Sequence, residues 1–102
     1  MTRNDRESVV KPADFSALTN FFRGYLHQDL AATYGSPLRA AHAFRQDADE
    51  RETAIVRGEL ERFLNETSRL PDADLFQIIE QLGSSWQFHT RRELEELRDA
   101  LK

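Results

Sequence analysis

The sequence predicts an all-α fold, a compact single-domain bundle of about five helices. Apolar residues recur at helical spacing through most of its 102 residues, and residues typical of helix starts and ends separate these segments. The main apolar cluster outside this pattern is the short link 84–89, so no strand competes with the helical interpretation. A chain of this length suits one domain with one core, and short links between helices are typical of a bundle.

The first helix is predicted to begin at Asp14, which we interpret as its cap, and to end shortly after Gly24. Its inward face carries apolar residues at i, i+3, i+7 and i+10, namely Phe15, Leu18, Phe22 and Tyr25. Phe21 lies about 100° from Phe22 around the helix and widens the apolar arc. Either this helix is central in the bundle or one ring faces a partner. We favour the central position, because large exposed rings are uncommon outside interfaces.

Capping signals mark the starts of the next two helices. In the pair Ser36-Pro37, serine can accept a hydrogen bond from a free amide and proline fits the first helical position. The second helix is predicted to run to about Gln46, with an inward face of Ala40, Ala41 and Phe44. Asp49 and Glu52 form a capping-box pattern for a third helix that continues to about Ser68. Its predicted buried stripe consists of Val56, Leu60, Phe63 and Leu64.

The last two helices are predicted from equally local patterns. Asp72 after Pro71 opens the fourth, and Gly83 follows it as a left-handed C-terminal residue. Its apolar positions are i, i+3, i+4 and i+7, namely Leu75, Ile78, Ile79 and Leu82. Thr90 and Glu93 suggest a second capping box, before a helix with a narrow seam of Leu94, Leu97 and Leu101.

The N-terminal segment differs from the rest of the chain. Residues 1–13 lack periodicity and are predicted to form a flexible N-terminal arm, whereas residues 14–102 form the helical domain. No apolar run approaches the roughly 18 residues that span a bilayer, and no apolar segment typical of a secretory signal follows the first charges. We therefore expect a cytoplasmic protein without membrane association. The lack of cysteine excludes disulfides, thiolate catalysis and cysteine-based zinc sites.

The net charge of −4 is concentrated in one region. Residues 47–74 contain nine acids and four arginines, so the net charge of that stretch is −5. Such a surface repels phosphate backbones, so direct nucleic-acid binding is disfavoured, and it suits a basic protein partner instead. The nine acids are Asp47, Asp49, Glu50, Glu52, Glu59, Glu61, Glu66, Asp72 and Asp74.

No pattern in the chain indicates catalysis or a cofactor. There is no Gly-x-Ser-x-Gly, no phosphate-binding Gly-x-x-x-x-Gly-Lys and no His-Glu-x-x-His, and acids interleaved with arginines are usually solvated helix faces. His27 and Asp29, joined by His42, could ligate a divalent ion. We favour a structural role, in which His27 and Asp29 bond free backbone groups where the first helix ends. No enzyme activity, metal or cofactor is expected.

The segment around the end of the first helix resembles a known family. Phe22, Gly24-Tyr25 and His27-Gln28-Asp29, followed by Tyr34-Gly35-Ser36, are similar to the motif of the small immunity proteins of contact-dependent growth inhibition systems. The resemblance runs from about Leu18 to Leu101. It implies that the shared motif residues serve the architecture rather than toxin contact, and these are Gly24, Tyr25, His27, Gln28, Asp29, Tyr34 and Gly35.

The resemblance also implies a function. Proteins of this family bind and neutralise the C-terminal toxin domain of a cognate effector, often a nuclease such as an RNase acting on tRNA, and so protect the producing cell. Nuclease toxins carry basic substrate-binding surfaces, which the acidic stretch would match. The alternative function is a small acidic helical adaptor that regulates another basic protein. The predicted toxin-binding residues are Asp47, Asp49, Glu50, Glu52, Glu59, Glu61 and Glu66.

Overall fold

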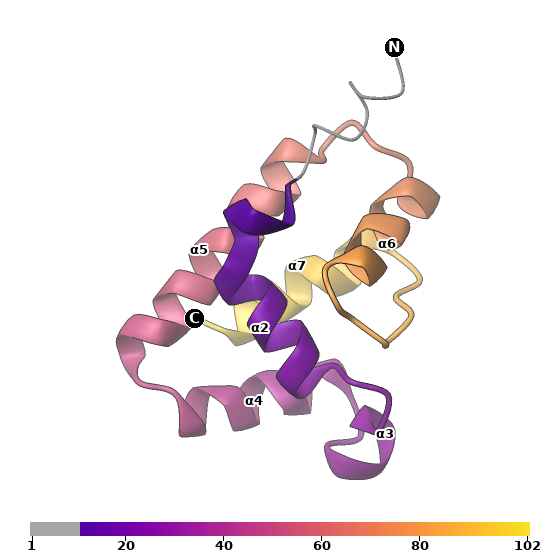
Figure 1. Ribbon diagram of the computed structural model, residues 1–102. Coiled ribbons are helices and arrows are strands. Elements are labelled where there is room, and N and C mark those ends of the chain that lie inside the picture. The colour runs from indigo at the N-terminus through magenta and orange to yellow at the C-terminus, as the bar shows by residue number, and fades with distance from the viewer. Residues whose placement is uncertain (1–10) are drawn as a thin grey trace.

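The computed structural model describes residues 11–102, and this part of the chain is helical without a strand, which confirms the predicted all-α domain (Figure 1). The five predicted helices are all present, and two short helical turns, η1 and α3, were not predicted. Residues 1–10 of the predicted arm lie outside the described residues, and Pro12 already belongs to η1. The elements are the 3-10 helix η1 (Pro12–Phe15) and the α-helices α2 (Ser16–Tyr25), α3 (Leu30–Thr33), α4 (Pro37–Asp47), α5 (Glu50–Glu66), α6 (Asp72–Gln81) and α7 (Arg91–Ala100).

Helix α2 is central in the bundle, as predicted from its two adjacent phenylalanines. Phe21 and Phe22 are both fully buried, together with Leu18. Helix α2 packs against α5 and α4, and Figure 1 shows it crossing the middle of the molecule between α5 and α6. The Phe21 ring meets the Phe44 ring of α4 edge to face at 5.0 Å between centroids. Both rings of the pair therefore serve the core.

The start of α2 differs from the prediction, because Asp14 is not its cap. Asp14 lies in η1, and Phe15 occupies the N-cap position without a side-chain hydrogen bond. The free amide of Leu18 donates instead to Oε1 of Glu59 on α5, at 2.9 Å. Arg62, one turn further along α5, donates to the carbonyl of Asp14 and lies over the Phe15 ring, 4.5 Å from its centroid. Two α5 side chains thus hold the beginning of α2.

The predicted caps of α4 and α5 are confirmed. The Ser36 hydroxyl accepts a hydrogen bond from the Arg39 amide at 3.3 Å, and Pro37 opens α4. The Asp49 carboxylate accepts one from the Glu52 amide at 2.8 Å, but the Glu52 carboxylate accepts none from the Asp49 amide, so only half of the predicted capping box is formed. Each bond satisfies an amide that has no partner inside its own helix.

The capping box predicted for α7 is wrong. Thr90 makes no side-chain capping bond, and the Glu93 carboxylate accepts from the amide of His89, at 2.8 Å, instead of the amide of Thr90. The first residue of the helix, Arg91, reaches back to the end of α5. Its guanidinium donates to the carbonyl of Leu64 at 3.3 Å and to that of Thr67. Arg91 therefore binds two carbonyls at the end of α5, and the Thr67 carbonyl also accepts a hydrogen bond from the Leu70 amide.

Helix α6 ends as predicted at a left-handed glycine. Gly83 has φ +111°, and an added Cβ would lie 2.7 Å from Cγ of Arg23 on α2. Next along the chain, the Ser85 amide donates to the Leu26 carbonyl at 2.8 Å. The link after α6 is thereby fixed against the end of α2. The side chains by which α6 and its end enter the core are Leu75, Ile79 and Leu82.

Replacing Gly83 with alanine is expected to lower the free energy of unfolding by about 1–3 kcal/mol, because alanine would be held at positive φ against Arg23. Gly58, exposed within α5 and with open space around its Cβ position, provides the matched control. Gly58→Ala should raise the free energy of unfolding by up to about 1 kcal/mol. Urea denaturation of both variants measures these changes. A Gly83→Ala variant as stable as the unmodified chain would contradict the prediction.

Candidate functional site

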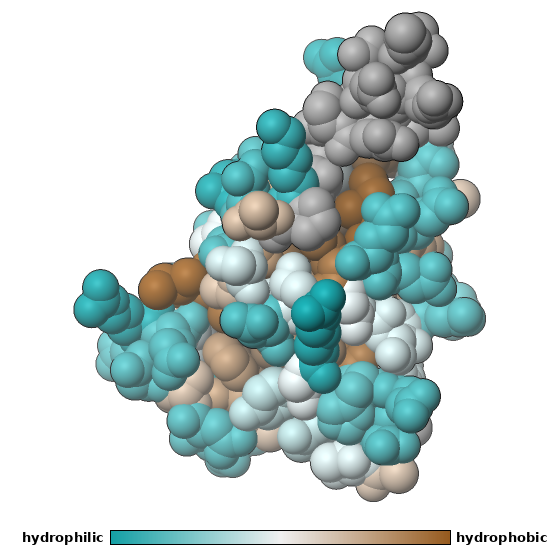
Figure 2. Space-filling view, viewed as in Figure 1, coloured by the Kyte–Doolittle hydropathy of each residue, from teal (hydrophilic) through white to brown (hydrophobic). Residues whose placement is uncertain are grey.

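A shallow groove lies between α2 and α5, which we call the α2/α5 groove. It is a hollow of about 270 Å³ whose lining is mainly apolar. Ile55 on its rim is 46% exposed, and among the other large hydrophobic side chains whose burial the structure describes, only Leu38 is similarly exposed. Figure 2 shows apolar side chains interrupting the hydrophilic surface on the side of α5. The lining residues are Ala17, Asn20, Phe21, Phe44, Glu52, Ile55 and Val56.

A tyrosine and an aspartate lie next to this groove. The Tyr25 hydroxyl donates a hydrogen bond to Asp47 Oδ2 at 2.7 Å. Burial, then the hydrogen bond to Asp47, and the negative charges of Asp47 and Glu52 raise the pKa of Tyr25 to about 12. The Tyr25 ring also meets the Phe44 ring edge to face, at 5.3 Å between centroids. Tyr25 therefore remains a neutral donor at neutral pH and fixes the position of the Asp47 carboxylate.

The acids of α5 do not form one surface. Glu52, Glu59 and Glu66 follow each other at seven-residue spacing, about two helical turns, so they share one edge of the helix. Glu59 bonds α2 and Glu52 lines the groove, which shows that this edge faces α2. The same helical periodicity places Glu50 and Glu61 on a different side. The structure thus separates residues that the charge count had grouped together.

Four of the seven predicted toxin-binding acids already have partners within the chain: Asp47, Asp49, Glu59 and Glu66. The carboxylates of Glu50, Glu52 and Glu61 have no hydrogen-bond or ion-pair partner among residues 11–102. Glu50, however, shares a surface hollow with Arg45, Arg57 and Lys102, which offset its charge. Glu52 is therefore the unpaired acid that borders the apolar groove.

The sequence did not single out Ile55 as a functional residue. Its position outside the predicted buried stripe of α5, next to the buried Val56, was the one available signal. Whether an isoleucine there is covered depends on how α2 lies against α5. The structure leaves it half exposed at the groove.

The family-motif residues lie at the turn between α2 and α4. His27 Nδ1 accepts a hydrogen bond from the Asp29 amide at 3.1 Å, as predicted for His27. The same prediction is wrong for Asp29, whose carboxylate bonds no backbone group among the described residues, and both Gln28 and Asp29 are exposed. Gly35 adopts φ +92°, which favours glycine there. Within residues 11–102, no three histidine, aspartate or glutamate side chains are grouped so that they could hold a metal ion.

The other motif residues include a stacked aromatic pair and a glycine without a steric role. The rings of Tyr25 and Tyr34 stack at 5.7 Å between centroids. Gly24 has open space around its Cβ position, so no contact in the structure requires glycine there.

Comparison with known protein families gives a match over residues 14–101 to the family described as CdiI immunity protein. The chain belongs to this CdiI immunity protein family. Searches of curated proteins and of solved structures found no match. Family membership confirms the resemblance seen in the sequence, and it implies a toxin-neutralising immunity protein that acts by binding its cognate toxin.

Among residues 11–102 of this CdiI family member, no helix combines the length and the apolar character that crossing a bilayer requires.

The raised pKa of Tyr25 predicts a pH dependence of stability. Because the folded pKa of Tyr25, about 12, exceeds its ordinary value of 10.0, the contribution of this hydroxyl to stability is complete below pH 10.0 and is lost as the pH rises to about 12. Absorbance titration of phenolate in a Tyr34→Phe variant, in which Tyr25 is the only tyrosine, measures the pKa directly. Adding Asp47→Asn should lower it, because the carboxylate charge is removed. A pKa near 10.0 for Tyr25 in the Tyr34→Phe variant that keeps Asp47 would contradict the prediction.

Proposed function

We propose that this CdiI family member neutralises a basic nuclease toxin domain, such as an RNase that acts on tRNA, by docking it on the α2/α5 groove. The toxin domain would be the C-terminal part of a contact-dependent growth inhibition effector. The observation that carries the proposal is the half-exposed Ile55 beside the unpaired carboxylate of Glu52.

The composition of the groove suits a protein partner. Interfaces commonly combine an apolar centre with a polar rim, and a few residues near the centre carry most of the binding energy. Here Ile55 and Phe44 contribute apolar surface, and Glu52 and Asp47 contribute negative charge at its border. A nuclease must attract phosphate backbones and so presents positive charge. The acidic stretch 47–74 would steer such a surface towards the groove.

The groove alone cannot provide high affinity. Burying a whole isoleucine side chain contributes about 1.5–3 kcal/mol, and Ile55 is already half covered, whereas a nanomolar complex requires about 12 kcal/mol. We therefore regard Ile55 as one anchor within an interface of standard size, about 1,600 Å² in total. The surrounding acids would contribute to the association rate and to specificity more than to affinity.

Co-purification with the C-terminal domain of the large secreted protein encoded beside this chain tests the partner. We expect a stable complex, and we expect cells that produce the toxin domain to grow only when this chain is present. A nuclease assay on tRNA and DNA, with and without this chain, then tests the class of toxin. Failure to form a complex together with failure to restore growth would contradict the proposal.

Two pairs of variants test the groove. Ile55→Ala should weaken toxin binding about 5- to 30-fold, because an anchor is lost, while Leu38→Ala removes an equally exposed side chain outside the groove. Glu52→Lys should slow association and reduce its salt dependence more than Glu61→Lys, which makes the same charge change on another side of α5. Binding kinetics at two salt concentrations measure both effects, and circular dichroism checks folding. Equal effects within each pair would show that the groove is not the docking site.

A further inference from the structure

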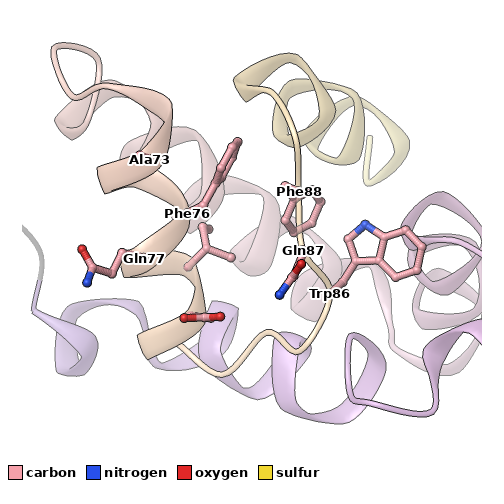
Figure 3. A pocket seen from close by; sticks show the side chains of 8 residues that line it. Ala73, Phe76, Gln77, Trp86, Gln87 and Phe88 are labelled. Carbon is pink, nitrogen blue, oxygen red and sulfur yellow. The ribbon is translucent and has the colours of Figure 1, made fainter.

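A second hollow, of about 350 Å³, lies between α6 and the link that follows it. Figure 3 shows Phe76 extending from α6 and Phe88 from the link, with Gln87 directed towards α6 and Trp86 directed away. The centroids of the Phe76 and Phe88 rings are 6.5 Å apart. The hollow has a mixed lining, in which these two rings and the buried Ile79 lie beside the polar residues Gln77 and Gln87.

The same hollow is lined by one carboxylate, that of Glu80. Glu80 is exposed in the last turn of α6 and has no hydrogen-bond or ion-pair partner among residues 11–102. That turn contains no basic residue. Because the C-terminal end of a helix carries partial negative charge, an acid there is locally unfavourable. Glu80 therefore lies without an ion-pair partner from the described residues beside a hollow of mixed lining, and the side chain of Arg23 lies near the end of the same helix, against Gly83.

A side chain with an apolar stem and a positive end fits this combination. The methylene groups of lysine or arginine can lie against the half-buried Phe76, while the charged end reaches Glu80. The aromatic faces also favour a cation. An acidic side chain would be repelled by Glu80, and an apolar one would leave its carboxylate without compensation as water is displaced. Phosphate groups are disfavoured for the same electrostatic reason.

We propose that the hollow between α6 and the link 84–89 binds a lysine or arginine side chain of the cognate toxin domain. The inference rests on the proposed function, since it assigns a second contact to the same partner. In the view of Figure 1, α5 and α6 lie on either side of α2, so the groove and the hollow belong to elements that flank the same helix. A standard interface covers about 800 Å² per partner, comparable with one side of a molecule measuring 44 × 27 × 20 Å.

Glu80→Gln tests the inference, with Asp74→Asn as the matched control on the same helix, because Asp74 is exposed and does not line the hollow. We expect Glu80→Gln to weaken binding of the toxin domain about tenfold and to lower the salt dependence of the dissociation constant. Asp74→Asn should change the dissociation constant less than about twofold. Unfolding cannot explain such a loss, since removing an acid from the end of α6 should not destabilise the fold. Urea denaturation checks this point.

A second measurement identifies the bound side chain. Each lysine and arginine of the toxin domain is changed to alanine, and its effect on affinity is measured against the unmodified chain and against Glu80→Gln. One position should weaken binding to the unmodified chain yet have little further effect on Glu80→Gln, which is the signature of direct coupling. If Glu80→Gln binds like the unmodified chain, or if no position couples to it, the inference is wrong while the proposed function stands. If the unmodified chain does not bind the toxin domain, both are wrong.

Discussion

The packing of α2 against α5 is the contact on which the rest of the molecule depends. Phe21 and Phe22 point in directions about 100° apart, and both are buried, so α2 must be enclosed by more than one neighbour. Helix α5 covers one side and also bonds the free amide of Leu18 through Glu59. The α2/α5 groove is consequently the open edge of this contact, since Phe21 belongs to both the core and the groove lining.

Features determined by neighbouring residues could be predicted from the sequence. The caps at Ser36 and Asp49 and the left-handed Gly83 each depend on one short segment, and the structure confirms them. The start of α2 could not be predicted in this way, because the partner of the Leu18 amide lies 41 residues further along the chain. The two short turns η1 and α3 also lack the repeated apolar spacing from which the longer helices were predicted.

In the candidate site, too, the features set by neighbouring residues could be predicted, and those set by residues far along the chain could not. Counting charges located the acidic region, but the count contains no information on which acids already have partners. Glu59 holds α2 and Asp47 accepts from Tyr25, whereas Glu52 borders the groove without a partner. The exposure of Ile55 also depends on the position of a different helix. The acidic region was therefore predictable, whereas the groove within it required the packed structure.

The two hydrogen bonds from Arg91 to the end of α5 have a topological consequence. They join the two ends of the segment 67–91, so α6 and its link form a loop that is closed at its base by one side chain. The free-energy cost of closing a loop grows only with the logarithm of the loop length, by about 0.6 kcal/mol for each doubling. Insertions on the outer side of this loop would thus cost little, provided that Leu75, Ile79 and Leu82 keep their places in the core. The surface carried by the loop can therefore diversify while the scaffold beneath it stays unchanged.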